Sequence, residues 1–107
     1  MTRRWLNQET FASQEEFCST FKVDVPDRFN FAFDVVDEIA AADPDRRALV
    51  WCDDQGGERV FTMAEIARES MRAAHVFKAM GIGKGDAVML MLRRRYEFWF
   101  ALLGLCR

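Results

Sequence analysis

The hydrophobic positions between Asn30 and Asp43 repeat with the period of an α-helix. Apolar residues recur three and four positions apart, at Ala32, Val35, Val36, Ile39 and Ala40. Asn30 can cap the start of this helix, and Asp34 lies close to the positive end of the helix dipole. Because proline interrupts helices, we expect the helix to end at Asp43 and Pro44.

A weaker helical signal precedes this helix. Ser13 and Glu16 have the spacing of a capping box, and two phenylalanines follow them on one face. Pro26 then forces the residue before it out of the helical conformation, so the connector is extended. We therefore divide the chain into an N-terminal helix with an extended connector, residues 1–29, and a second part, residues 30–107.

Two short runs rich in β-branched and aromatic residues follow the second helix. "ALVWC" (48–52) and "RVFT" (59–62) are separated by "DDQGGE", which is typical of a β-hairpin with a glycine-containing loop. Asp53 and Asp54 raise the alternative of a calcium loop. Since the remaining ligand positions of such a loop are absent, we favour a plain turn.

The next helix has a well-marked start. Thr62 and Glu65 form a T-x-x-E capping box, and Phe61 and Ile66 occupy the positions of a hydrophobic staple. One face then carries Ile66, Ser70, Ala73, Phe77 and Met80, and its small members allow a neighbouring element to approach closely. His75 is the only histidine and lies outside this face without ligand-type neighbours, so we expect an ordinary surface histidine.

The glycine-rich segment "GIGKGD" (81–86) is a candidate for a nucleotide-binding loop. A P-loop requires Ser or Thr after its lysine, whereas Gly85 follows Lys84, and the dinucleotide motif requires its third glycine one residue later. Both motifs also run from strand into helix, and this segment runs from helix into strand. We therefore predict a corner in which Gly81 closes the helix in a left-handed conformation and Ile82 continues a Schellman ending.

The last third of the chain is strongly apolar. "AVMLML" (87–92) is apolar on both faces, as expected of a strand buried in a parallel sheet. Arg93, Arg94 and Arg95 follow; they suit a phosphate or nucleic acid, but a solvated strand end is the favoured alternative. The apolar residues of 98–105 cover every side of a helix, which predicts a buried helix that needs further polypeptide to cover it.

Composition and charge exclude several classes of protein. The chain has 107 residues, half of them hydrophobic, and a net charge of −2, which argues against a nucleic-acid binder. Cys18, Cys52 and Cys106 are odd in number and far apart, so a disulfide framework or zinc site is not expected. Residues 98–106 are far short of the roughly 20 residues of a membrane span. Because the start of the chain has no secretory or transit signal, we predict a cytoplasmic protein.

Several segments, taken in order, resemble the N-terminal region of AMP-forming acyl-CoA synthetases of the adenylate-forming superfamily. They are "FNFAFDVVDEIAAADPDRRALVW", "GGERVFTMAEI", "ARESMRAAHVFKAMGIGKGDAVMLML" and "YEFWFALLGLCR". The first and last resemble most the medium-chain, acetyl-CoA synthetase-like branch. The resemblance implies an α/β fold: a partial N-terminal domain with a β-hairpin, a crossover helix, a buried strand and a helix.

The resemblance also implies a reaction. Members of this family join a carboxylate to CoA through an acyl-adenylate, releasing AMP and pyrophosphate, and use ATP, CoA and Mg²⁺. Their phosphate-binding loop, ribose-binding aspartate and C-terminal lysine motifs do not occur in these 107 residues. No catalytic, cofactor-binding or metal residue is therefore assigned, and none of these ligands is expected to bind this chain alone. The matching residues are scaffold: Gly81, Gly83, Gly85 and Asp86 at the corner, and Ala48, Leu49 and Trp51 in the first strand.

Two functional hypotheses follow. In the first, the chain is the N-terminal part of an acyl-CoA synthetase for a short- or medium-chain fatty acid, inactive alone and completed by the remainder of its domain or by another copy. In the second, it is a free-standing, non-catalytic interaction module derived from that fold. Nucleic-acid binding through the consecutive arginines conflicts with the acidic net charge.

Overall fold

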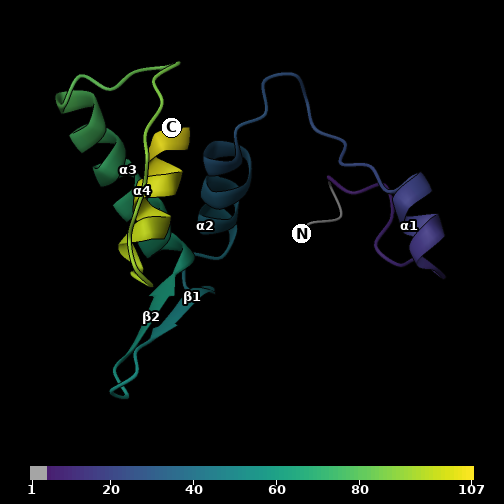
Figure 1. Cartoon of the computed structure of the whole chain (residues 1–107), viewed down its shortest axis with the longest axis horizontal. Coiled ribbons are helices and arrows are strands. Elements are labelled where there is room, and N and C mark those ends of the chain that lie inside the picture. Colours follow the sequence, from purple (N-terminus) through teal and green to yellow (C-terminus); the bar gives the residue numbers. More distant parts are fainter. Residues whose placement is uncertain (1–4) are drawn as a thin grey trace.

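The computed structural model describes residues 5–107 of the chain. Its elements are α1 (Gln14–Thr20), η2 (Ala32–Asp37), α2 (Glu38–Ala42), β1 (Arg47–Cys52), β2 (Glu58–Thr62), α3 (Met63–Ala79) and α4 (Glu97–Cys106). Figure 1 shows α3, α4 and the η2–α2 helix grouped above the hairpin, with α1 set apart on a long connector. The combination of helices and a two-stranded antiparallel sheet confirms the predicted α/β class.

The N-terminal arm, residues 5–29, packs largely against itself. An isolated bridge joins Leu6 to Val23, and the rings of Phe11, Phe17 and Phe21 form a small aromatic cluster. The chain has a radius of gyration of 16.5 Å, whereas a compact domain of this length has about 13 Å. The arm therefore extends away from the body, as Figure 1 also shows.

The start of α1 forms half of the predicted capping box. The Ser13 hydroxyl accepts a hydrogen bond from the Glu16 amide at 3.2 Å. The Glu16 carboxylate, however, accepts from the Ala12 amide at 2.7 Å and not from that of Ser13. The hydrogen bond from the Ala12 amide, and to a smaller extent that from the Gln8 side chain, lowers the pKa of the Glu16 carboxyl group.

The helix predicted from Asn30 is present and contains an unpredicted π-helical segment. The Asn30 side chain accepts from the Ala32 amide at 2.9 Å, and the Asp34 carboxylate accepts from the Asn30 amide at 2.6 Å. These reciprocal bonds confirm Asn30 as the cap. The wider winding covers Ala32–Asp37, and normal α-helix resumes in α2 until Ala42.

The hairpin forms as predicted, with Val50 opposite Val60 and Leu49 opposite Phe61. Its loop is organised by Asp53, whose carboxylate accepts from the Gln55 and Gly57 amides at 2.9 and 2.7 Å. This explains the glycine at position 57, because a Cβ there would lie 2.5 Å from the same carboxylate. The acidic loop is thus a plain turn.

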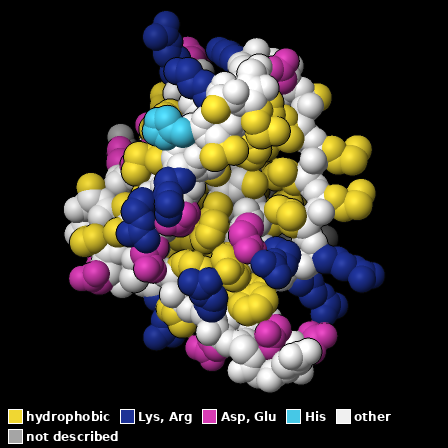
Figure 2. Space-filling model, turned by 90° about the vertical axis from the view of Figure 1, so that its left-hand side faces the viewer, with side chains coloured by type: hydrophobic (Ala, Val, Ile, Leu, Met, Phe, Trp, Pro, Cys, Tyr) yellow, Lys and Arg dark blue, Asp and Glu magenta, His cyan; other side chains and the backbone are white. Residues whose placement is uncertain are grey.

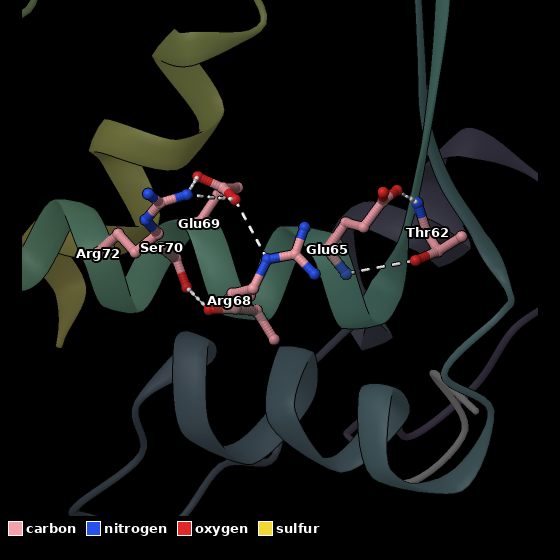
Figure 3. Close-up of polar contacts among 7 residues, drawn as sticks. Thr62, Glu65, Arg68, Glu69, Ser70 and Arg72 are labelled. Atoms are coloured by element: carbon pink, nitrogen blue, oxygen red, sulfur yellow. Dashed lines mark hydrogen bonds and ion pairs between the residues drawn. The ribbon is translucent and has the colours of Figure 1, made fainter.

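Helix α3 begins with the complete capping box that the sequence predicts. The Thr62 hydroxyl accepts from the Glu65 amide at 3.2 Å, and the Glu65 carboxylate accepts from the Thr62 amide at 2.9 Å (Figure 3). Phe61 and Ile66, the predicted staple, are both buried. Because the orphan donors of the first turn are satisfied, the hairpin passes directly into the helix.

The end of α3 is the predicted Schellman motif. Gly81 has a φ of +84°, its amide donates to the Lys78 carbonyl at 3.0 Å, and the Ile82 amide donates to the Phe77 carbonyl at 3.0 Å. The glycine segment therefore seals the carbonyl end of a helix. It presents no helix N-terminus to an anion, which confirms the corner interpretation.

Replacing Gly81 with valine is expected to lower the free energy of unfolding by about 1–3 kcal/mol. A Cβ on Gly81 would meet no atom within 4 Å, so the cost comes from backbone conformation alone. Gly83→Val is the matched control, because Gly83 has no positive φ. Chemical denaturation measures both; equal midpoints for the two variants would contradict the left-handed assignment.

The strand predicted over residues 87–92 is not formed, which corrects one part of the fold prediction. No strand lies there within residues 5–107, although the chain follows an extended course between the glycine corner and α4 (Figure 1). Val88 and Leu90 are half-buried, whereas Met89 and Met91 are each 85% exposed. The apolar pattern is that of a strand, but a strand also requires a neighbouring strand, and the hairpin does not provide one.

Helix α4 packs closely against α3 through a glycine. A Cβ on Gly104 would lie 2.7 Å from the Ala73 Cβ and 3.0 Å from the Ser70 carbonyl oxygen. The small residues predicted on α3 therefore do allow close approach. Trp99 and Leu102 are exposed on its outer face, so the described residues cover only part of the apolar surface of α4, as expected of a helix that needs further polypeptide to cover it.

The core of the body is small and lies where α3, α4, η2 and the hairpin meet. Its buried hydrophobic residues are Val36, Phe61, Ile66, Ala67 and Leu103, with Ala40, Leu49, Met63, Tyr96 and Phe100 packed around them. Among the described residues, no helix is both long and apolar enough to cross a lipid bilayer.

Candidate functional site

The candidate functional residues considered in the sequence analysis lie in separate places. His75 is exposed on α3, and its Nδ1 lies 2.9 Å from the Met71 carbonyl oxygen. Asp53 is engaged in the hairpin turn. Within residues 5–107, no group of His, Cys, Asp or Glu side chains is arranged to hold a metal ion, and Cys18, Cys52 and Cys106 are free and exposed.

The consecutive arginines face the tip of the hairpin. Arg93, Arg94 and Arg95 line an open hollow of about 500 Å³ together with residues 51–55. The opposite wall of this hollow carries Asp53 and Asp54, so its charge is mixed. Figure 2 shows basic and acidic side chains interspersed, with hydrophobic side chains between them, on the face that it draws. A hollow of mixed charge differs from the continuous basic surface that is typical of a nucleic-acid site.

The backbone and side chains of this arginine segment have local partners. The Trp51 indole donates to the Arg94 carbonyl at 2.6 Å, and Arg94 has a φ of 45°. Arg95 forms an ion pair with Glu97 at 2.8 Å. The hydrogen bond between them raises the pKa of Arg95 and lowers the pKa of Glu97. The Arg95 side chain is thus held by Glu97 at the first turn of α4.

The pair between Arg95 and Glu97 gives a pH-dependent contribution to stability. Because the pKa of Glu97 is lowered below its ordinary 4.5, this contribution is present above pH 4.5 and is lost as the pH falls through the lowered pKa. The side chains of both partners are accessible to solvent, so screening by water keeps this contribution to stability small. Unfolding of wild type and Glu97→Gln should differ at pH 7 and converge in acid; a difference that grows in acid would contradict the assignment.

Tyr96 connects the hairpin to α4. Its ring lies 5.0 Å from that of Phe61 and 5.4 Å from that of Trp51, centroid to centroid. The Arg59 guanidinium lies 4.9 Å from the centre of the Tyr96 ring and donates to the Tyr96 hydroxyl at 2.6 Å. This aromatic cluster already contains a cation from the chain itself, so it is a packing contact and not an open cation site.

A polar network that sequence patterns did not reveal joins η2, α3 and α4. The Arg107 guanidinium donates to both carboxylate oxygens of Asp37, at 2.8 and 2.5 Å, and to the Ser70 hydroxyl at 2.9 Å. Ser70 in turn donates to the Ala67 carbonyl at 2.8 Å (Figure 3). The Asn30 amide also donates to the Cys106 carbonyl. These groups satisfy one another, so the network clamps helices together and leaves Ser70 engaged as both donor and acceptor.

A second hollow, of about 890 Å³, lies between the end of α3, the glycine corner and the end of α4. Its walls combine apolar residues such as Phe77 and Ile82 with the rim lysines Lys78 and Lys84. At the glycine segment this hollow meets the capped carbonyl end of α3, which is not the helix N-terminus at which phosphate binds.

Comparisons with known proteins identify the family. A model of the AMP-binding enzyme family matches residues 36–107. The chain is 36% identical over 90 residues to acyl-coenzyme A synthetase ACSM2B of Homo sapiens, covering 78% of this chain and 16% of that protein. It is 35% identical over 98 residues to ACSM5 of Rattus norvegicus, covering 86% and 17%. It is 31% identical over 110 residues to ACSM3 of Homo sapiens, covering 97% and 19%.

These relatives contradict the predicted cytoplasmic location, because each of the three is named as a mitochondrial protein. That prediction was wrong for two reasons. Free thiols are typical of a reducing compartment, but they do not separate one reducing compartment from another. The chain also spans only 16–19% of the length of these relatives, so its first residues carry no information on a leader sequence.

The fold and the family match agree with each other. The matched region begins within η2 and includes the hairpin, α3, the glycine corner and α4. The chain belongs to the family of AMP-binding enzymes.

Proposed function

We propose that this chain forms the N-terminal part of a mitochondrial AMP-forming acyl-CoA synthetase that acts on a short- or medium-chain fatty acid. The observation that carries the proposal is 31–36% identity to mitochondrial acyl-coenzyme A synthetases over 78–97% of the chain. In this proposal residues 30–107 begin the AMP-binding domain, and residues 1–29 form an arm that precedes it.

The proposed reaction has two steps and uses ATP, Mg²⁺ and CoA. A carboxylate oxygen attacks the α-phosphorus of ATP, and the bond to pyrophosphate breaks. The CoA thiol then attacks the acyl carbon, loses its proton and displaces AMP. The family motifs that neutralise the phosphate charges do not occur in these 107 residues, so no step is assigned to a residue of this chain.

In this proposal the chain contributes packing that supports the rest of the enzyme, and it contributes no reacting group. Its hairpin, α3 and α4 form a packed unit that includes the clamp between Arg107 and Asp37. A rigid unit of this kind positions groups that come from elsewhere in an enzyme, and small displacements of such groups are costly to catalysis.

The proposal is tested with a chimera in which this chain replaces its matching segment in ACSM2B of Homo sapiens. We expect AMP formation that depends on both CoA and a medium-chain carboxylate. The parent enzyme and the parent lacking the segment are the controls. A folded chimera without this activity, beside an active parent, would contradict the proposal and favour the free-standing module.

The isolated chain is expected to be catalytically silent. Carboxylate-dependent exchange of pyrophosphate into ATP should not exceed a control without protein, because the chain does not assemble the groups that stabilise the reacting phosphates. Exchange by the purified chain that is proportional to its concentration would contradict the scaffold role.

A further inference from the structure

Two arginine side chains just before α4 have no partner in the part of the chain that the structure describes. The guanidiniums of Arg93 and Arg94 form no hydrogen bond or ion pair there, whereas Arg95 pairs with Glu97. Both side chains are exposed, and both line the hollow at the hairpin tip. Like charges on consecutive residues repel each other, and an anion between them relieves this repulsion. The two guanidiniums are therefore available to an anion in one space.

The backbone of Arg94 has a conformation that favours glycine. Its φ is 45°, and the Trp51 indole donates a hydrogen bond of 2.6 Å to its carbonyl oxygen. A side chain makes this left-handed conformation unfavourable, whereas glycine adopts it freely. Residues held in such conformations cluster at binding and catalytic sites. Since the turn itself does not require an arginine, the guanidinium is the feature that explains this residue.

The hollow that these arginines line has the size and the polar groups of a small-ligand site. Its volume of about 500 Å³ lies within the range of such sites. Arginine forks bind phosphate through paired hydrogen bonds, and a phosphoryl group offers three strong acceptor oxygens. On the opposite wall, Asp53 accepts from two amides of its turn, whereas Asp54 has no partner among the described residues. The Asp54 carboxylate can therefore accept from hydroxyl groups of a ligand.

We propose that this hollow is a binding site for a small phosphate ester, separate from the reaction of the synthetase. Arg93 and Arg94 bind its phosphoryl group, and Asp54 accepts from hydroxyl groups on the rest of the ligand. Trp51 is a positioning residue, because it holds the Arg94 carbonyl and thereby orients the segment that carries both arginines. The aspartates on the opposite wall disfavour a long polyanion, whose further charges they would repel.

Nuclear magnetic resonance of the ¹⁵N-labelled chain measures this binding directly. Inorganic phosphate and glycerol 3-phosphate are the two probes, each compared with chloride at equal ionic strength. We expect shifts of the Trp51 indole signal and of the amides of residues 93–95 that saturate by about 20 mM. The ester should bind more tightly than inorganic phosphate, because its carbon-bound hydroxyl groups reach Asp54. Since the chain is measured by itself, the outcome is independent of synthetase activity.

Arg94→Gly separates binding from folding. Glycine removes the guanidinium and suits the left-handed backbone, so binding should weaken by about 10-fold or more while the thermal midpoint is not lowered. Arg93→Gln should weaken binding to a similar extent. Arg95→Gln is the matched control, because Glu97 already holds that guanidinium, and binding should change by less than about 2-fold. Asp54→Asn should remove the preference for the ester.

Several results would overturn the proposal. Equal shifts with chloride and with phosphate would show that ionic strength alone moves these signals. Equal weakening by the substitutions of Arg93, Arg94 and Arg95 would show a diffuse effect of charge without a defined site. Full binding by Arg94→Gly would remove that arginine from the site, and a lowered midpoint in this variant would contradict its left-handed backbone. Equal affinity for the two probes would overturn the role of Asp54 and the assignment of an ester.

Discussion

Replacing Gly104 with alanine is expected to lower the free energy of unfolding by about 1–3 kcal/mol, although alanine is the better helix former. The new methyl group would lie 2.7 Å from the Ala73 Cβ and 2.9 Å from the Ala74 amide nitrogen. Two of its close neighbours are backbone atoms of α3, at Ala74 and Ser70, which cannot turn aside as a side chain can. The helices must therefore separate.

The sign of this effect separates packing from helix propensity. Propensity alone predicts a gain of about 1 kcal/mol for the same substitution. Urea denaturation followed by circular dichroism measures the difference, and Leu102→Ala on the exposed side of α4 serves as the control. A more stable Gly104→Ala variant would show that α3 and α4 do not pack as closely as described.

Replacing Asp37 with alanine is expected to cost about 1.5–3 kcal/mol. The Arg107 side chain is only 6% exposed, whereas that of Asp37 is 35% exposed. Loss of the carboxylate leaves the buried guanidinium with the Ser70 hydroxyl as its remaining partner of the network. The partial exposure of Asp37 keeps the cost below that of a fully buried pair.

A double-mutant cycle isolates the pair. Asp37→Ala, Arg107→Ala and the double variant should give a coupling free energy of about 1–2 kcal/mol. The exposed pair between Glu69 and Arg72 is the control, where removal of one partner should change stability by less than about 0.5 kcal/mol. Additive effects of the Asp37 and Arg107 substitutions would contradict the clamp.

The features that sequence predicts well are those determined by residues a few positions apart. The capping box of Thr62 and Glu65 and the Schellman ending at Gly81 each satisfy backbone groups of a single helix end. Their geometry is complete within four or five residues. Local chemistry therefore suffices to place both ends of α3.

The features that sequence does not predict depend on distant partners. Arg107 lies 70 positions from Asp37 and 37 from Ser70, and no local pattern connects them. The apolar run over 87–92 has the composition of a strand, but the hairpin offers it no neighbouring strand, so the local pattern does not determine whether it pairs. The π-helical segment in η2 is a different case, because its cause is not a distant partner. Over so short a segment, the spacing of apolar residues is the same in a π-helix and an α-helix, so hydrophobic periodicity does not distinguish the two.

The location escapes sequence patterns for a different reason. The cysteine content of a chain indicates whether its compartment is reducing, but it does not indicate which compartment that is. The relatives that are named as mitochondrial point to a location that neither the free cysteines nor the charge of the chain indicates.

A chain that serves a synthetase by packing, and supplies no reacting group, should tolerate loss of its exposed histidine but not loss of its helix contact. Carboxylate-dependent pyrophosphate exchange by the ACSM2B chimera measures this directly, with His75→Ala and Gly104→Leu compared in that background. We predict that His75→Ala retains exchange and that Gly104→Leu loses it. Loss of exchange in the folded His75→Ala chimera, with retention in Gly104→Leu, would contradict the scaffold role.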